Sequence, residues 1–346
     1  MKLTEEIEKA VNMFIVNTIE EHPNDLVSFV MNHFELSRPT VMRLIKQLIE
    51  NNTIIRKNPR GRNPGYQLKT TRFSSVYQLG KENLQEDKIY YESVMPHVEN
   101  LPKNIQQLFE YSAMEIINNA IEHSGGSQLT ILVSINLKHV EVDIIDNGVG
   151  IFNKIQKDLD LQTPQQSILE LCKGKFTSDP KRHSGEGIFF SSRMVDQFII
   201  FSYGIIFNGH EDNDMIYEAN ADDNFKGTAV RLLVNRDTKR TPIDVFDIYS
   251  DQDKDPTFHR RSIPVRIMNI EGGNLVSRSQ AKRLLTRVDR FTTVVLDFEG
   301  VEMIGQAFAD EIFRVFKATH PDVKIVPENA NANIGKMIRH VESSIQ

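Results

Sequence analysis

The chain has 346 residues, enough for two or three domains, and its 40% hydrophobic and 25% charged residues are ordinary for a globular protein. A single cysteine excludes a disulfide framework within the chain and a cysteine-rich metal site. The opening residues MKLTEEIEKA are acidic and polar rather than secretory, and no apolar run approaches the ~20 residues of a membrane span, so we expect a cytoplasmic protein without a membrane partner.

Residues 1–72 are predicted to form a small helical domain that ends in a basic hairpin. Apolar residues recur at helical spacing over 4–20 and 24–34, and a third helix with one apolar face follows over 37–52. Residues 53–69 are typical of two short strands around an NPRGRNPG turn. This order resembles a winged helix-turn-helix, which implies that the third helix enters the major groove of double-stranded DNA.

The charge of this region supports an interaction with DNA. From Ser37 to Arg72 there are nine cations and one anion, a net charge of +8 in a chain of net charge -6. Attraction to phosphates requires such a local patch. The alternative is a winged helix used for dimerisation or protein contacts, with solvated cations. The residues expected to contact DNA are Arg38, Thr40, Arg43, Lys46, Arg56, Arg60 and Arg62.

After an expected linker at 73–91, a second domain is predicted over 92–236. Its long helix, 106–123, places Glu115 and Asn119 one turn apart, so that a carboxylate and an amide point the same way. This pair alone is weak evidence for a site.

Three further stretches of this domain combine polar residues with glycines. A strand ends on an acid and is followed by two glycines, which allow a close approach of the backbone. A Gly-x-Gly stretch precedes a helix start, where free backbone N–H groups face an anion. A Gly-Thr pair opens a later strand. The residues concerned are Asp146, Gly148, Gly150, Gly185, Glu186, Gly187 and Thr228.

These elements, in this order, resemble the GHKL ATPase family of gyrase-type topoisomerases, MutL proteins, heat-shock chaperone ATPases, histidine kinases and anti-sigma kinases. EIINNA (115–120) is similar to the N box of the family, DNGVG (146–150) and SGEGI (184–188) to its glycine boxes, and KGT (226–228) to its last motif. The string EIINNAIEHS is most similar to the anti-sigma kinase version. The resemblance implies the Bergerat fold, an α/β sandwich with a mixed sheet.

The resemblance also implies ATP and Mg²⁺ as cofactors. Asn119 would coordinate Mg²⁺ at the phosphates, and Glu115 would position or deprotonate the attacking water. Asp146 would accept a hydrogen bond from the adenine amino group, supported by Thr228 through a water. Residues 152–184 would form a lid that orders over the nucleotide. The remaining residues would leave room beside adenine (Gly148, Gly150) or donate backbone N–H groups to phosphate (Gly185, Glu186, Gly187).

A second linker is expected at 237–262, followed by a small α/β domain over 263–346 in which strands alternate with helices. LDFEGVEMIGQAFADEIF resembles the STAS-domain core of anti-anti-sigma factors, which implies a protein partner. The helix start that carries a phosphorylatable serine in that family reads Gly305-Gln306-Ala307 here, so the acceptor serine is absent.

The sequence therefore predicts an α+β multidomain regulator. Binding of Mg-ATP, with slow hydrolysis allowed by Glu115, would change DNA binding by the winged helix and partner contacts by the STAS-like domain. Analogy with GHKL domains, which often pair, and with winged helices, which often act as dimers, implies a homodimer. The competing interpretation is a protein serine kinase or ATP-driven enzyme whose end domains are docking modules. A nucleotide-free scaffold is a third alternative.

Overall fold

The computed structural model describes residues 3–57, 65–80, 84–173, 187–209, 215–218, 225–249, 260–266, 268, 275–286 and 288–343. The described chain is α+β, with a two-stranded, a seven-stranded and a three-stranded sheet. Parallel and antiparallel pairs both occur, the parallel ones in the three-stranded sheet. Within these ranges, every helix is too short or too polar to cross a bilayer.

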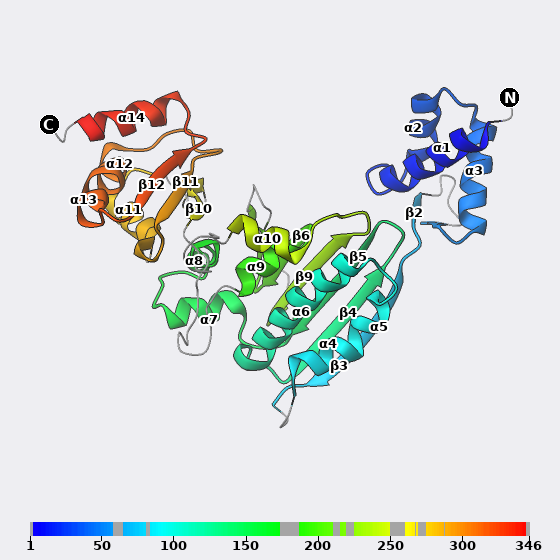
Figure 1. Cartoon of the computed structure of the whole chain (residues 1–346), viewed down its shortest axis with the longest axis horizontal. Helices are drawn as coiled ribbons and strands as arrows, with labels where there is room; N and C mark the ends of the chain where they lie inside the picture. The colour runs from blue at the N-terminus through cyan, green and yellow to red at the C-terminus, as the bar shows by residue number, and fades with distance from the viewer. Residues whose placement is uncertain are drawn as a thin grey trace.

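The N-terminal unit consists of three helices and a two-stranded antiparallel sheet (Figure 1). Its apolar faces meet in a core that is separate from that of the rest of the chain, because no buried side chain is shared between the two clusters. A separate core is what allows this unit to fold as a domain. Its elements are α1 (Glu5–Thr18), α2 (Leu26–Phe34), α3 (Arg38–Glu50), β1 (Ile54–Arg56) and β2 (Tyr66–Leu68).

The central sheet has the strand order β3-β4-β5-β9-β6-β7-β8, and all its pairs are antiparallel. Along β5, valine and isoleucine point to the core while Glu141 and Asp143 point to the other face, where Arg231 pairs with both. The strands are β3 (Thr71–Gln78), β4 (Gln128–Ile135), β5 (His139–Asp146), β6 (Gln197–Ser202), β7 (Ile205–Gly209), β8 (Met215–Glu218) and β9 (Thr228–Asn235).

Helices cover one face of this sheet, as Figure 1 shows. The longest is α6 (Lys103–His123), whose apolar side is fully buried against the strands. It lies beside α4 (Glu86–Ser93), α5 (Met95–Val98), α9 (Gly187–Met194) and α10 (Pro242–Tyr249).

The expected linker at 73–91 is wrong. Most of β3 lies in this range as the outermost strand of the sheet, and α4 packs against α6 through the buried Ile89 and Tyr90. As an edge strand, β3 has exposed residues on both faces and therefore lacks the alternation of apolar and polar residues by which strands are recognised.

The expected linker at 237–262 is also wrong in part. Residues 242–249 form α10, where the Phe246 ring lies 5.4 Å from that of Tyr111 and 4.8 Å from that of Phe190. These aromatic contacts join α10 to α6 and α9. Residues 250–259 lie outside the described ranges.

The C-terminal unit is a parallel sheet, β10-β11-β12, with helices packed around it. Ser277 caps its first helix in a capping box with Gln280, as expected for a serine at a helix start. Its elements are β10 (Arg260–Pro264), α11 (Arg278–Leu285), a 3₁₀ turn (Val288–Arg290), β11 (Thr293–Asp297), α12 (Gln306–Asp310), a π-helical turn (Glu311–Phe316), α13 (Lys317–Thr319), β12 (Lys324–Glu328) and α14 (Ala332–Ser343).

Two helices occupy the first part of the segment expected to form a lid: α7 (Ile151–Asp158) and α8 (Gln166–Lys173). The Ser167 hydroxyl donates to the Phe152 carbonyl at 2.7 Å, which ties α8 to α7. The α8 helix also packs against β10, so this segment contacts the C-terminal unit.

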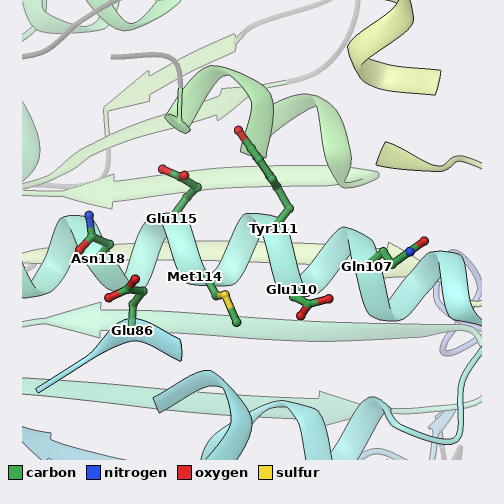
Figure 2. A pocket seen from close by; sticks show the side chains of 7 residues that line it. All are labelled: Glu86, Gln107, Glu110, Tyr111, Met114, Glu115 and Asn118. Atoms are coloured by element: carbon green, nitrogen blue, oxygen red, sulfur yellow. The ribbon is translucent and has the colours of Figure 1, made fainter. Parts of the chain in front are cut away.

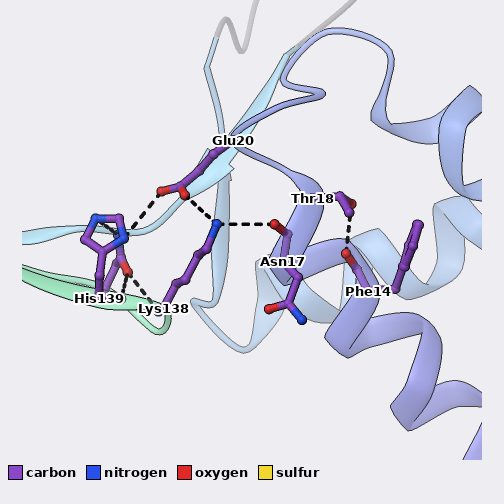
Figure 3. A network of polar contacts seen from close by, with 7 residues as sticks. Phe14, Asn17, Thr18, Glu20, Lys138 and His139 are labelled. Carbon is purple, nitrogen blue, oxygen red and sulfur yellow. Dashed lines mark hydrogen bonds and ion pairs between the residues drawn. The ribbon is translucent and has the colours of Figure 1, made fainter. Parts of the chain in front are cut away.

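A small polar network joins the N-terminal unit to the turn between β4 and β5 (Figure 3). Lys138 Nζ donates to the Asn17 carbonyl at 3.3 Å and to Glu20 Oε2 at 3.0 Å. His139 Nδ1 lies 3.8 Å from Glu20 Oε1. Burial lowers the pKa of His139 below its usual 6.5, against the opposing effect of Glu20, so the ring is neutral at neutral pH. Lys138 is therefore the cation that fixes this contact.

We predict that Lys138→Ala loosens the N-terminal unit without unfolding the protein. Exposed ion pairs contribute only ~0–1 kcal/mol, so the unfolding temperature should hardly change. Amides at the C-terminal end of α1 should exchange faster with deuterium, because their anchor is lost. Lys154→Ala is the control, since it removes the local Lys154–Asp158 pair of α7. Unchanged exchange in Lys138→Ala would contradict the anchoring role.

Candidate functional site

A buried carboxylate lies where two neighbouring strands of the central sheet meet. Asp146 ends β5 opposite Thr228, the first residue of β9, and only 6% of Asp146 is exposed. Its Oδ1 accepts a hydrogen bond from the Gly148 N–H at 2.8 Å, and Thr228 also hydrogen-bonds to it directly. The Thr228 hydroxyl in turn accepts from the Ile151 N–H at 3.0 Å. A carboxylate has about four acceptor positions, so Asp146 keeps capacity for a donor on a ligand.

The pKa of Asp146 reflects this environment. Burial raises it above the usual 3.8, while the hydrogen bonds from Gly148 and Thr228 oppose the rise. The neutral carboxyl thus contributes stability that is present below pH 3.8 and is lost as the pH rises through the raised pKa. Wherever the carboxyl is ionised, the folded protein therefore holds this charge at some cost in stability.

The glycines around Asp146 allow segments that are distant in sequence to approach each other closely. A Cβ on Gly148 would lie 2.6 Å from the carbonyl carbon of Ser124, just after α6, and one on Gly150 would lie 2.5 Å from the Tyr203 ring. Gly227 has φ +112°, and a Cβ added to it would lie 2.9 Å from Asn147 Cα, just after β5. The sequence predicted that the absence of side chains at Gly148 and Gly150 makes room for adenine. In the structure, Ser124 and Tyr203 occupy the space where those side chains would lie.

A second part of the site lies where α9 meets α6. A Cβ on Gly187, the first residue of α9, would lie 3.0 Å from Glu115 Cδ. The Glu115 carboxyl therefore sits at the start of a helix, where backbone N–H groups lack helical partners. Asn119 lies one helical turn after Glu115 in α6, between Glu115 and Ser124, and is half-buried. Its side chain makes no hydrogen bond with any described residue.

An open cleft of about 440 Å³ runs along α6 beside Glu115 (Figure 2). Three carboxylates contribute to it, and one of them, Glu110, accepts a hydrogen bond from the Tyr91 hydroxyl at 2.6 Å. This charge opposes the entry of a triphosphate. Apart from Glu115, none of the predicted nucleotide ligands lines the cleft. Its lining residues are Glu86, Gln107, Glu110, Tyr111, Met114, Glu115 and Asn118.

Gly185 and Glu186, expected to donate to phosphate, lie outside the described residues, as does the rest of 174–186. In the described ranges no group of three His, Cys, Asp or Glu side chains is placed to hold a metal. Asn147, which sequence reasoning passed over, accepts from the N–H groups of Ser127 and Gln128 at 2.8 and 2.9 Å. The Asn147-Gly148 pair is a sequence pattern typical of turns, and it could have indicated that the Asn147 side chain bonds to the backbone.

The residues expected to contact DNA are partly engaged within the protein. Arg38 and Arg56 are exposed, but Arg43 pairs with Glu8 of α1, and the Lys46 amine lies 3.7 Å from a carboxylate of the same helix. The Thr40 hydroxyl hydrogen-bonds at 2.8 Å to the hydroxyl of Ser37, the N-cap residue of the same helix. Arg60 and Arg62 lie outside the described residues. The local excess of positive charge is thus smaller at α3 than the sequence from 37 to 72 indicates.

Comparison with known proteins identifies one region of the chain. The family model described as "STAS-like domain of unknown function (DUF4325)" matches residues 280–334. No curated protein matches the chain. The C-terminal unit is therefore a STAS-like domain. At the expected acceptor position, the Gly305 N–H donates to the Leu275 carbonyl at 2.7 Å, and an added Cβ would lie 2.8 Å from Val276 Cα.

We predict that alanine is far less tolerated at Gly227 than at Gly187. An alanine at Gly227 would meet backbone and would need a left-handed conformation, which costs about 1–3 kcal/mol before any clash. An alanine at Gly187 would meet only the end of the Glu115 side chain, which can move. Thermal unfolding of both variants checks this, and equal losses of stability would contradict it.

Proposed function

We propose that the chain is an ATP-binding regulator in which Mg-ATP, held by the central unit, controls DNA binding by the N-terminal unit. In this proposal the central unit is a GHKL-type ATPase domain and the N-terminal unit is a winged helix. The observation that carries the proposal is the buried Asp146 carboxylate, which keeps free acceptor capacity at the end of β5. Because carboxylates with perturbed pKa values cluster at functional sites, Asp146 is a candidate ligand-binding residue.

The adenine contact follows from the chemistry of this carboxylate. The Gly148 and Thr228 hydrogen bonds orient Asp146 and help to keep it ionised. An ionised carboxylate accepts hydrogen bonds only, so it selects a ligand that presents a donor, such as the amino group of adenine.

The phosphates would be held at the other part of the site. Asn119 has an uncommitted amide oxygen, and Mg²⁺ takes few protein ligands because it keeps waters and binds the phosphates. Its site therefore does not require a cluster of carboxylates. Glu115 would orient the attacking water, and the N–H groups at the start of α9 would face the phosphates.

Two described contacts support coupling between the units. The α8 helix, part of the proposed lid, packs against β10 of the STAS-like domain. The Lys138–Glu20 contact joins the N-terminal unit to the strand that ends at Asp146. Nucleotide binding would act through them only if ATP prefers one arrangement of the units over another.

We predict that Asp146→Asn weakens ATP binding by about one to two orders of magnitude, because a hydrogen bond to a charged group contributes ~1.5–3 kcal/mol. Asp143→Asn is the matched control: the same substitution in the same strand, but on the face that pairs with Arg231. It should leave the affinity unchanged. Calorimetric titration measures both.

In the same titrations, Asn119→Ala should weaken ATP binding only when magnesium is present. Equal effects of Asp146→Asn and Asp143→Asn would remove the adenine contact from the proposal. Equal effects of Asn119→Ala with and without magnesium would remove the metal contact.

We predict that Mg-ATP changes the affinity of the full chain for double-stranded DNA, measured by mobility shift. Arg38→Ala should weaken binding to all sequences and lower the salt dependence by about one ion, as for the loss of one phosphate contact. No response to ATP would contradict a regulator. Transfer of labelled phosphate to protein would favour the kinase alternative instead.

A further inference from the structure

The outer edge of β3 is an unpaired strand edge. The Leu79 N–H, just after β3, donates to the Ser127 carbonyl of the β4 side at 2.9 Å. Because backbone groups alternate in direction along an antiparallel strand, those of the even-numbered residues of β3 point away from β4. None of them pairs with a described residue. These residues are Arg72, Ser74, Val76 and Gln78.

Among the features that usually protect a strand edge, this one has a single charged residue, Arg72. Its pairing with β4 is continuous over Thr71–Gln78, without a bulge, and the strand contains neither proline nor lysine. Phe73 and Val76 are 38% and 56% exposed, on opposite faces of the sheet. A long strand edge of this kind is a template for another strand.

We propose that β3 pairs with β3 of a second copy of this chain, antiparallel, about a two-fold axis at Ser75. In this register Arg72 lies opposite Gln78 of the other copy, and Ser74 lies opposite Val76. All four outward-facing residues then exchange both backbone hydrogen bonds, ~8 in total. Such an interface is self-complementary, as a two-fold axis requires.

The side chains favour the same register. It places Phe73 opposite Tyr77 of the other copy, in a pair without backbone hydrogen bonds, where opposing side chains come closest. Aromatic cross-strand pairs of this kind contribute ~0.2–1 kcal/mol each. The Phe73 ring is already held by its stack on His97, with centroids 3.7 Å apart, so it is oriented before a partner arrives.

The position of the N-terminal unit also fits a second copy. Only residues 69 and 70 separate β2 from β3, and the Lys138 contact holds the unit at that end of the sheet. In the proposed pair the two Thr71 residues would be ~27 Å apart, from eight residues of ~3.3 Å each. Each N-terminal unit lies beyond this point, so the two units could reach DNA half-sites spaced by ~34 Å or a multiple of it.

The test is the mass of the full chain by sedimentation over a hundredfold range of concentration, without DNA or nucleotide. The wild type should shift from one chain to two. Ser74→Pro removes an outward N–H and leaves the β4 pairing intact, since proline is tolerated at such a position of an edge strand. It should raise the dissociation constant at least tenfold. Ser74→Ala keeps the N–H and should dimerise like the wild type.

Two further measurements make the result decisive. Val76→Lys places a charge on the edge and should also weaken the dimer, and unfolding temperatures show that each variant is folded. In the wild-type dimer, the amides of the four outward-facing residues should gain protection from hydrogen exchange. A wild type of one chain at every concentration, or a dimer unaffected by Ser74→Pro, would overturn the proposal. Because nucleotide is absent, failure of the proposed function leaves this test intact.

Discussion

The close approach of α6 to the segment after β5 is the constraint on which the central unit depends. Ser124 contacts Gly148 at one end, and Glu115 contacts Gly187 two to three turns earlier. The Gly148 approach is to backbone, so a Cβ there would have to displace the end of α6, whereas a Cβ on Gly187 would meet only the movable end of the Glu115 side chain. The segment that carries Asp146 is therefore positioned against α6 by packing of the backbone, and not only by hydrogen bonds.

Within this frame, Asp146 is a charge that the fold holds at a cost. Burial disfavours its ionised form, and the hydrogen bonds from Gly148 and Thr228 only partly compensate. A hydrophobic or amide side chain would avoid the cost of burying a charge, and in the proposed function a ligand that donates to the carboxylate offsets this cost. By contrast, the charge of Asp143 is balanced within the protein, because Arg231 on the neighbouring strand β9 donates hydrogen bonds to both of its carboxylate oxygens.

The sequence predicted the elements with strong periodicity or clear caps. The long helix expected over 106–123 and the strand expected to end on an acid both form, as α6 and β5. It failed for β3 and α10, because both are short or exposed and are stabilised by contacts distant in sequence, such as the β4 ladder and the Tyr111 ring. Of the site, sequence placed Glu115 and Asn119 on one helix. It could not show that Gly148 packs against Ser124, or that Arg43 pairs with Glu8, since both contacts depend on tertiary structure.

The central claim is that the acceptor at the end of β5 reads an adenine base. The most direct measurement is calorimetric titration of the full chain with ATP and with GTP under identical conditions. Adenine presents an amino donor where guanine presents a carbonyl acceptor, which an ionised Asp146 would repel. The account predicts that ATP binds and that GTP binds at least tenfold more weakly. Equal affinity for the two nucleotides, or binding of neither, would contradict it.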